Sequence, residues 1–431
     1  MLTREAAKTA SRPSVMPRAV VFGLALVVFV SASPAGAQVP AQPLPTVGIE
    51  LEVANSPIRR SNGLFTAAAE TSNLGADFGL DVAFGDHRAR GPKAVLGRLA
   101  RVWLVNLPIA ALAQGVAHDF GHFARLDEVG IHTRQRTIKQ WPWPVPVTIS
   151  AEDFGPFHRL IPAAQLGILG AGEQASLTLK QSLTDKIYGG DRADYFDWVL
   201  LGYAALDFPA YGFSDLRPSY FESLQQFFAA GPGDFRQYVA TLAVLDPAGL
   251  SLQTLQTHAD SLRRDCWLNL VDYPLFAAVS RVATYVVTGD RRTAPPTLTL
   301  RRLRVVPGAH ASLTALGPAK GLDIRLVTSP YLDHVGAEMI TTPSNNRLWA
   351  ATLELRSRDT ARLLPDVRLN VWQRPMPDAG FRLEAGVRRV IPRMGGRLEG
   401  LVHVGYKTEG YLADAPGRAG LLFSASAATR Y

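Results

Sequence analysis

The stretch Trp349-Ala350-Ala351-Thr352-Leu353-Glu354-Leu355-Arg356 decides the fold of this 431-residue chain. Its larger apolar side chains fall on every second residue, and small, polar or charged residues stand between them. Successive side chains of a β-strand point to opposite faces, so this period of two predicts a strand with one apolar and one polar face. The two faces of this strand are therefore expected to meet different surroundings.

The same alternation recurs from about residue 309 to the C-terminus. Further runs occupy residues 322–326, 367–371, 381–388 and 398–405, and a final run ends on Tyr431. Together they predict about eight strands of about nine to eleven residues, the length with which a tilted strand crosses a bilayer. We expect an antiparallel, β-barrel-like region over residues 306–431.

The N-terminus has the order of a cleavable export signal. Basic residues between positions 4 and 18 precede an apolar run over 19–30, and Ala35-Gly36-Ala37 provides a small-x-small cleavage site. The apolar run is about 12 residues long, too short to span a bilayer comfortably, although an uncleaved anchor is the alternative. We expect residues 1–37 to be a signal peptide and the mature protein to act outside the cytoplasm.

With this signal, the C-terminal region resembles the bacterial outer-membrane β-barrels, including their aromatic last residue, here Tyr431. The resemblance implies an apolar face toward outer-membrane lipid and a charged face toward a lumen, which tolerates charge. A soluble or half-open sheet packed on helices gives the same alternation and remains the alternative.

Composition excludes several classes of protein. The net charge of +8 is spread along the chain without a basic run that interleaves aromatic residues, so we expect no nucleic-acid partner. The single cysteine, Cys266, allows no internal disulfide and is expected to be buried filler among apolar neighbours. The chain has no phosphate-binding glycine loop and no Gly-x-Ser-x-Gly elbow, so covalent catalysis by serine is not expected.

Two further regions precede the C-terminal strands. Residues 38–90 are interpreted as a leader followed by strands, because 47–53 and 78–84 alternate with a period of two. Residues 91–305 are interpreted as a helical domain with a metal site, because apolar residues recur at intervals of three and four. The best-defined helices are expected over 97–127, 159–186, 194–206, 219–230 and 272–288.

The sharpest chemical signal is His118-Asp119-Phe120-Gly121-His122. On a helix, His118 and His122 lie one turn apart on the same face, a spacing that binds zinc. Asp119 occupies the position at which the HExxH pattern has a glutamate that acts as general base. Because aspartate is one methylene shorter, this difference weakens the expected proteolytic activity more than the expected metal binding.

A third protein ligand is needed for zinc, and Glu173 in Gly170-Ala171-Gly172-Glu173-Gln174-Ala175 is the best candidate. The glycines beside it would let a second helix approach the histidine helix closely. This arrangement resembles the gluzincin class of zinc metallopeptidases over residues 97–190. The resemblance implies that His118, His122 and Glu173 bind Zn²⁺ and that Asp119 is the catalytic base.

The whole chain also resembles a loosely defined group of bacterial exported proteins with an HExGH-type helix, a Gly-Gly-Glu-type helix and C-terminal strands. The residues that carry this resemblance lie at 118–130, 170–175, 270–275 and 312–318. It implies an α+β fold in which a helical domain with a zincin-like helix pair is inserted between N-terminal strands and a C-terminal antiparallel β-barrel-like sheet. The resemblance to this group implies an architecture but no particular activity.

Two other interpretations of the histidine motif stay open. The adjacent His118-Asp119 pair also resembles HD-type metal phosphohydrolases, in which His87 would serve as the upstream histidine. Alternatively, the histidines are structural or vestigial and the chain is a non-catalytic outer-membrane β-barrel or scaffold protein.

The favoured expectation is a zinc-dependent, metallopeptidase-like protein of the cell envelope that acts on a peptide or protein. It would lie in the outer membrane with a periplasm-facing helical domain, or in the periplasm.

Overall fold

The computed structural model describes twelve stretches of the chain. These are residues 49–54, 57–84, 90–131, 156–231, 233–301, 303–328, 331–357, 364–373, 379–393, 396–408, 410 and 419–430. The expected signal peptide, the upstream histidine His87 and the C-terminal Tyr431 lie outside the described residues.

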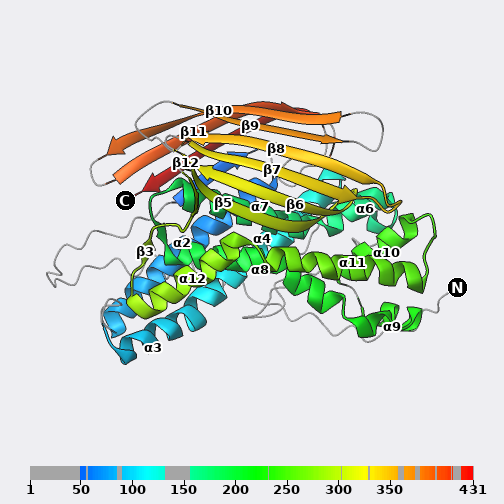
Figure 1. Ribbon diagram of the computed structural model, residues 1–431, viewed down its shortest axis with the longest axis horizontal. Helices are drawn as coiled ribbons and strands as arrows, with labels where there is room; N and C mark the ends of the chain where they lie inside the picture. Colours follow the sequence, from blue (N-terminus) through cyan, green and yellow to red (C-terminus); the bar gives the residue numbers. More distant parts are fainter. Residues whose placement is uncertain are drawn as a thin grey trace.

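The protein has two layers, a large antiparallel sheet and a layer of helices on one of its faces (Figure 1). The sheet has ten strands in the order β1-β12-β11-β10-β9-β8-β7-β6-β5-β4. Their bounds are β1 (Ile49–Ala54), β4 (Leu298–Leu300), β5 (Leu303–Thr314), β6 (Gly317–Val327), β7 (Tyr331–Thr341), β8 (Arg347–Ser357), β9 (Leu364–Gln373), β10 (Ala379–Arg393), β11 (Gly396–Lys407) and β12 (Gly420–Arg430). The C-terminal strands are therefore confirmed, and the stretch that defines the pattern is β8.

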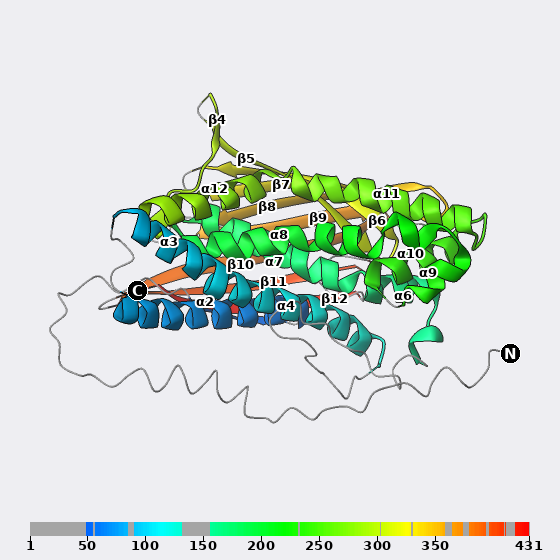
Figure 2. The ribbon, with the colours of Figure 1, turned by 90° about the horizontal axis from the view of Figure 1, so that it is seen from below.

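The helical layer runs alongside the strands (Figure 2). Its helices are α2 (Pro57–Phe84), α3 (Pro92–Arg101), α4 (Leu107–Glu128), α6 (Pro162–Leu169), α7 (Ala171–Gly189), α8 (Tyr195–Asp215), α9 (Leu224–Ala229), α10 (Asp234–Leu245), α11 (Leu252–Leu270) and α12 (Tyr273–Thr288). A π-helical turn (Val102–Asn106) joins α3 to α4, and a 3-10 turn (Pro218–Phe221) precedes α9. The short strands β2 (Ala193–Asp194) and β3 (Arg292–Thr293) pair separately from the large sheet.

Helix α8 lies at the centre of the helical layer because its sequence is apolar on nearly every side. Trp198, Leu200 and Leu201 are fully buried. The helix begins at an N-cap, where the carboxylate of Asp194 accepts a hydrogen bond from the Phe196 amide at 3.0 Å. The same buried cluster includes Val306 of β5 and Leu332 of β7, so helices and sheet share one core.

The sheet is open, which corrects the expectation of a closed barrel. Its edge strands among the described residues are β1 and β4, and β4 covers only the first part of β5. Beyond the part that β4 covers, side chains of the helical layer form hydrogen bonds with the backbone groups of β5. These are the groups that a further strand would otherwise pair with.

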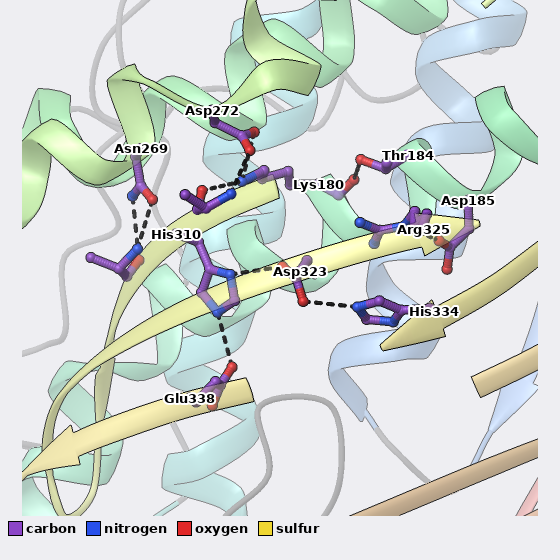
Figure 3. Close-up of polar contacts among 12 residues, drawn as sticks. Lys180, Thr184, Asp185, Asn269, Asp272, His310, Asp323, Arg325, His334 and Glu338 are labelled. Carbon is purple, nitrogen blue, oxygen red and sulfur yellow. Dashed lines mark hydrogen bonds and ion pairs between the residues drawn. The ribbon is translucent and has the colours of Figure 1, made fainter. Parts of the chain in front are cut away.

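Three side chains show how the helices terminate the sheet at β5 (Figure 3). Asn269 accepts from the Ala311 amide at 2.7 Å and donates to the Ala311 carbonyl at 3.3 Å. Asp272 accepts from the Ala309 amide at 2.9 Å, and Lys180 donates to the Ala309 carbonyl at 3.3 Å. The backbone groups that barrel closure would require are therefore already paired with side chains.

Residues 78–84 form the last part of helix α2, which corrects the strand expected there. Polar residues Asn73, Asp77 and Asp81 recur every four residues and share one side of this helix. Arg101 pairs with Asp77 at 3.5 Å and with Asp81 at 2.7 Å, and Arg291 pairs with Asp77 at 2.7 Å. These buried and partly buried ion pairs fix α2 against α3 and the segment that follows α12. In contrast, β1, over residues 49–54, is a strand as expected and pairs with β12.

One helical run among the described residues, Pro92–Glu128, is long and apolar enough to cross a membrane. The pair α11 and α12 meets the same criterion only if the two helices, bent by 49°, count as one span. A core helix of a soluble protein has the same length and composition, so neither segment carries an argument about location.

Candidate metal centre

Helices α4 and α7 approach each other closely at two glycines, as the sequence predicts. A Cβ atom added to Gly121 of α4 would lie 2.3 Å from the carbonyl oxygen of Ala171. A Cβ atom added to Gly172 of α7 would lie 2.3 Å from His118 Nε2 and 2.5 Å from His122 Nε2. Only glycine therefore allows this contact between the helices.

The two histidines of α4 project from the same side of the helix, in agreement with their spacing. Both are buried, and their Nε2 atoms lie 3.3 Å apart. The ring of Tyr211 stacks on His118 at a centroid distance of 4.7 Å and an angle of 8°. The imidazoles are thus held in one orientation by packing.

The other nitrogen of each histidine has its own partner. His118 Nδ1 lies 2.8 Å from Asp207 Oδ2, and His122 Nδ1 lies 2.7 Å from the carbonyl oxygen of Ile168. A carbonyl can only accept, so His122 donates from Nδ1, and the carboxylate favours the same tautomer for His118. This tautomer directs both Nε2 lone pairs toward the same space, as in protein metal sites.

Asp234 provides a third donor to the two imidazoles. Its Oδ2 lies 3.4 Å from His118 Nε2 and 3.3 Å from His122 Nε2. The three donor atoms form a nearly equilateral triangle. Three ligands of a tetrahedral zinc ion with bonds of about 2.0–2.1 Å would lie about 3.3–3.4 Å apart. These residues form a group that could hold a metal ion.

Glu173, the ligand expected from the sequence, lies in a second, overlapping group with His118 and Asp207. It is buried, and within the described part of the chain no N–H group donates to its carboxylate oxygens, which lie beside the carboxylate of Asp207. A proton on either carboxyl group would form a hydrogen bond between the two. Burial and then the charge of Asp207 raise the pKa of Glu173 well above its ordinary value. A buried carboxylate without hydrogen bonds is costly, so this group suits either a proton or a nearby cation.

Asp119, the expected base, is buried but belongs to neither of the two metal-binding groups. It follows His118 on α4 and interacts electrostatically with Tyr211. The structure therefore brings His118 and His122 together with Asp234, and places Glu173 and Asp207 beside His118.

The charges of the site favour a cation. Burial alone would lower the pKa of both imidazoles, but Asp207 raises the pKa of His118 well above its ordinary value, and Asp234 raises that of His122. Burial would raise the pKa of Asp234, and the two imidazoles more than reverse this effect and lower it. Several carboxyl groups thus surround two imidazoles, and a metal ion bound here would displace the protons that these groups hold.

Two of these residues were not identified from the sequence. Asp207 is an acidic residue within the apolar stretch 198–211, and a buried acid in such a helix is a signal for a polar partner. Asp234 follows Gly231-Pro232-Gly233 at the start of α10, far along the chain from the histidines. No local pattern connects it with them.

Comparison with known proteins gives no assignment. No protein-family model, curated protein or solved structure matches the chain. The interpretation of the site therefore depends on its own geometry.

Proposed function

We propose that the protein is a zinc-dependent hydrolase of the metallopeptidase type, with Zn²⁺ held by His118, His122 and Asp234. The observation that carries the proposal is the triangle of His118 Nε2, His122 Nε2 and Asp234 Oδ2, whose sides measure 3.3–3.4 Å. A catalytic zinc site has three protein ligands and one open position, and this set supplies three.

The donor set and its dimensions both favour zinc. Two imidazoles and a carboxylate also occur in non-haem iron(II) sites, which are octahedral. In an octahedral site with bonds of about 2.1 Å, neighbouring ligands lie only about 3.0 Å apart. The wider triangle fits tetrahedral coordination better. Gly172 supports the assignment, because a Cβ there would occupy the space beside both Nε2 atoms.

The zinc ion would polarise a substrate carbonyl and acidify a bound water molecule. We assign proton transfer to Glu173, because its carboxyl group lies in the same buried cluster as His118 and beside the carboxylate of Asp207, with which it can share a proton. Asp207 orients His118 through Nδ1 and so keeps Nε2 free to bind. The alternative, from the sequence resemblance, has Glu173 as the third ligand and Asp119 as the base.

Solvent reaches the site from the side of α10. The Asp234 side chain is 30% exposed, whereas that of His118 is 1% exposed. A substrate would therefore approach past the beginning of α10. The likeness of the α4–α7 helix pair to metallopeptidases supports a peptide or protein substrate.

A non-catalytic metal site in a scaffold protein is the second candidate, favoured by the deep burial of His118. The HD-type phosphohydrolase is less well supported, because it needs Asp119 as a ligand beside His118 and Asp119 lies in neither metal-binding group.

Metal analysis of the purified protein, stripped with a chelator and reloaded, tests the proposal. We expect one zinc ion per chain and its loss in Asp234→Ala. Glu173→Gln should retain zinc but lose cleavage of a peptide library, and Glu222→Gln, on the surface, should change neither. Loss of zinc in Glu173→Gln would support the alternative ligand set. Wild-type protein that binds no metal would refute the zinc proposal, and zinc binding without peptide cleavage would support the scaffold function.

A further inference from the structure

The faces of the large sheet are reversed relative to those of an ordinary soluble protein. On β6, Asp323 and Arg325 point toward the helices and are buried, whereas Leu322 and Ile324 point away and are 65% and 47% exposed. Soluble proteins place apolar residues inside and leave charges in water. The exposure of apolar side chains on the face away from the helices therefore requires an explanation.

The central strands show the same reversal. On β10, Arg382 and Glu384 are buried on the inner side, where Arg382 bonds the Glu384 carboxylate. The residues between and beside them, Phe381, Leu383 and Val387, are 43–48% exposed. The pattern therefore extends across the sheet and is not a local defect of one strand.

The buried charges of the inner side are paired with one another and with the helices (Figure 3). Asp323 lies between two imidazoles, 2.9 Å from His310 Nδ1 and 2.8 Å from His334 Nε2. Arg325 donates to Asp185 of α7 at 2.8 Å. Because these groups have charged partners inside the protein, the orientation of the strands is fixed, and the apolar residues are left facing outward.

We propose that the side of the sheet away from the helices, which we call the outer face, lies against the hydrocarbon of a lipid bilayer. The outer face is represented by Leu322, Ile324, Leu353, Leu383, Val402 and Val404, from β6, β8, β10 and β11. Covering these side chains with hydrocarbon would remove their exposed apolar surface from water, which is favourable. The proposal does not depend on the metal site.

The shape of the sheet favours lipid over a second copy of the chain. The sheet arches over the helical layer, with β1 packed on α2 at one edge and β5 on α7, α11 and α12 toward the other (Figure 1). Two copies of a convex surface touch over only part of their area, whereas fluid lipid chains follow the curve. The arch also turns the edges toward the helices, where side chains bond the β5 backbone, so those groups avoid the hydrocarbon.

The strands have features that a bilayer requires. Strands β5 to β12 contain 10 to 15 residues each, and about 9–11 are enough to cross the hydrocarbon when tilted. Trp349, Phe381 and Tyr406 lie near the same end of β8, β10 and β11, and the last two rings are 6.2 Å apart. Aromatic residues at one end of neighbouring strands suit the boundary between lipid chains and headgroups.

Fluorescence at single engineered cysteines tests the proposal on the full chain. The natural Cys266 is fully buried, so Leu353→Cys and Val402→Cys can be labelled with an environment-sensitive fluorophore. Gln253→Cys, exposed at the start of α11, is the matched control. In phosphatidylcholine–phosphatidylglycerol vesicles, we expect a blue shift at Leu353 and Val402 and loss of their emission with brominated lipid. The label at residue 253 should show neither effect.

The result that overturns the proposal is equal quenching at all three positions or none at any. A dimer in lipid-free solution with the two sheet labels shielded would show instead that a second copy covers the outer face. The unfolding temperature of each labelled protein verifies that the fold is retained.

Charge substitution gives an independent measurement. The double change Leu353→Glu and Val402→Glu should abolish co-flotation with vesicles. Phe228→Glu changes a residue of α9 that is 62% exposed on the helical layer, and it should leave flotation unchanged. Unchanged flotation of the folded double variant would contradict the proposal.

Discussion

Gly172 of α7 lies so close to His118 of α4 that a Cβ atom on it would stand 2.3 Å from the imidazole Nε2. The same atom would stand 2.5 Å from His122 Nε2, nearly the distance of an ion bound by both rings. The backbone of α7 thus packs directly against the two donor nitrogens. The candidate metal site and the close helix contact depend on the same missing side chain.

Gly172→Ala should abolish zinc binding, because the methyl group competes with the ion and pushes the imidazoles apart. Metal content after reloading is the measurement. Gly115→Ala is the control, since Gly115 lies on α4 and its Cβ would meet no atom within 4 Å. Gly115→Ala should bind zinc normally and gain up to about 1 kcal/mol of stability from helix propensity. Normal zinc affinity in a folded Gly172→Ala protein would contradict the proposed ligand geometry.

Asp207→Asn should lower the zinc affinity about 10–100-fold without removing a proposed ligand. The amide can no longer accept a charge-assisted hydrogen bond from His118 Nδ1, so the imidazole loses orientation and basicity. Zinc titration against a competing chelator measures this. Asp246→Asn is the matched control, because Asp246 lies 3.0 Å from a histidine outside the site, His258. Equal affinities of all three proteins would show that Asp207 does not support the site.

Asn269→Ala should destabilise the fold by about 1–3 kcal/mol, because it leaves the amide and carbonyl of Ala311 unpaired at the free edge of β5. Urea unfolding measures the effect, and Gln253→Ala at an exposed position of the same helix provides the comparison. Should the two variants be equally stable, the side chain would not be what satisfies this edge.

The strands of the C-terminal region could be predicted because each one carries its own period of two. The sequence could not show whether the sheet closes into a barrel or stays open. Closure depends on partners for the edge of β5, and these are Asn269 and Asp272, polar residues at the end of one helix and just before the next. The role of these two residues depends on the tertiary structure. The alternation of apolar and polar residues is the same in a barrel and in an arched sheet.

The sequence predicts a strand over residues 78–84, the last part of α2, because Asp77 to Phe84 also fits a period of two over a short window. The spacing of four between Asn73, Asp77 and Asp81 was the better signal. It indicates one polar side of a helix, and it accounts for the ion pairs that this helix makes.

The candidate metal centre was predictable to the extent that it is local. The His118–His122 spacing and the glycines around Glu173 correctly indicated two helices in close contact. Asp234 is contributed by α10, and only the folded chain brings it 3.3–3.4 Å from both imidazoles. The sequence therefore indicated two of the three donors of the candidate site, whereas the position of the third depends on how the helices pack.

The stability of the protein should fall as the pH rises from about 6.5 to about 9 because of His310 and His334. Burial lowers the pKa of both, and Arg325 lowers that of His334 further. The charge of Asp323 and hydrogen bonds with Asp323 and Glu338 reverse this for His310, and hydrogen bonds with Asp323 and Glu354 do so for His334. Both pKa values rise to about 9. A raised histidine pKa means that the folded state holds the proton more tightly than the unfolded chain, so the stabilisation is complete below about 6.5 and lost above about 9.

Replacement of His310 by Gln removes one of these protons and should flatten the alkaline part of the profile, by on the order of 1–3 kcal/mol between pH 6.5 and 9. Urea unfolding across this range, with each variant compared with wild type, gives the difference. Asp323 does not contribute here, because its pKa is lowered well below its usual value by the imidazoles in spite of burial. His258→Asn is the control: burial lowers the pKa of His258, so its contribution changes only below about pH 6.5. An unchanged alkaline slope in His310→Gln would mean that Asp323 binds neutral imidazoles, and that the inner side of the sheet is held by hydrogen bonds without the two positive charges.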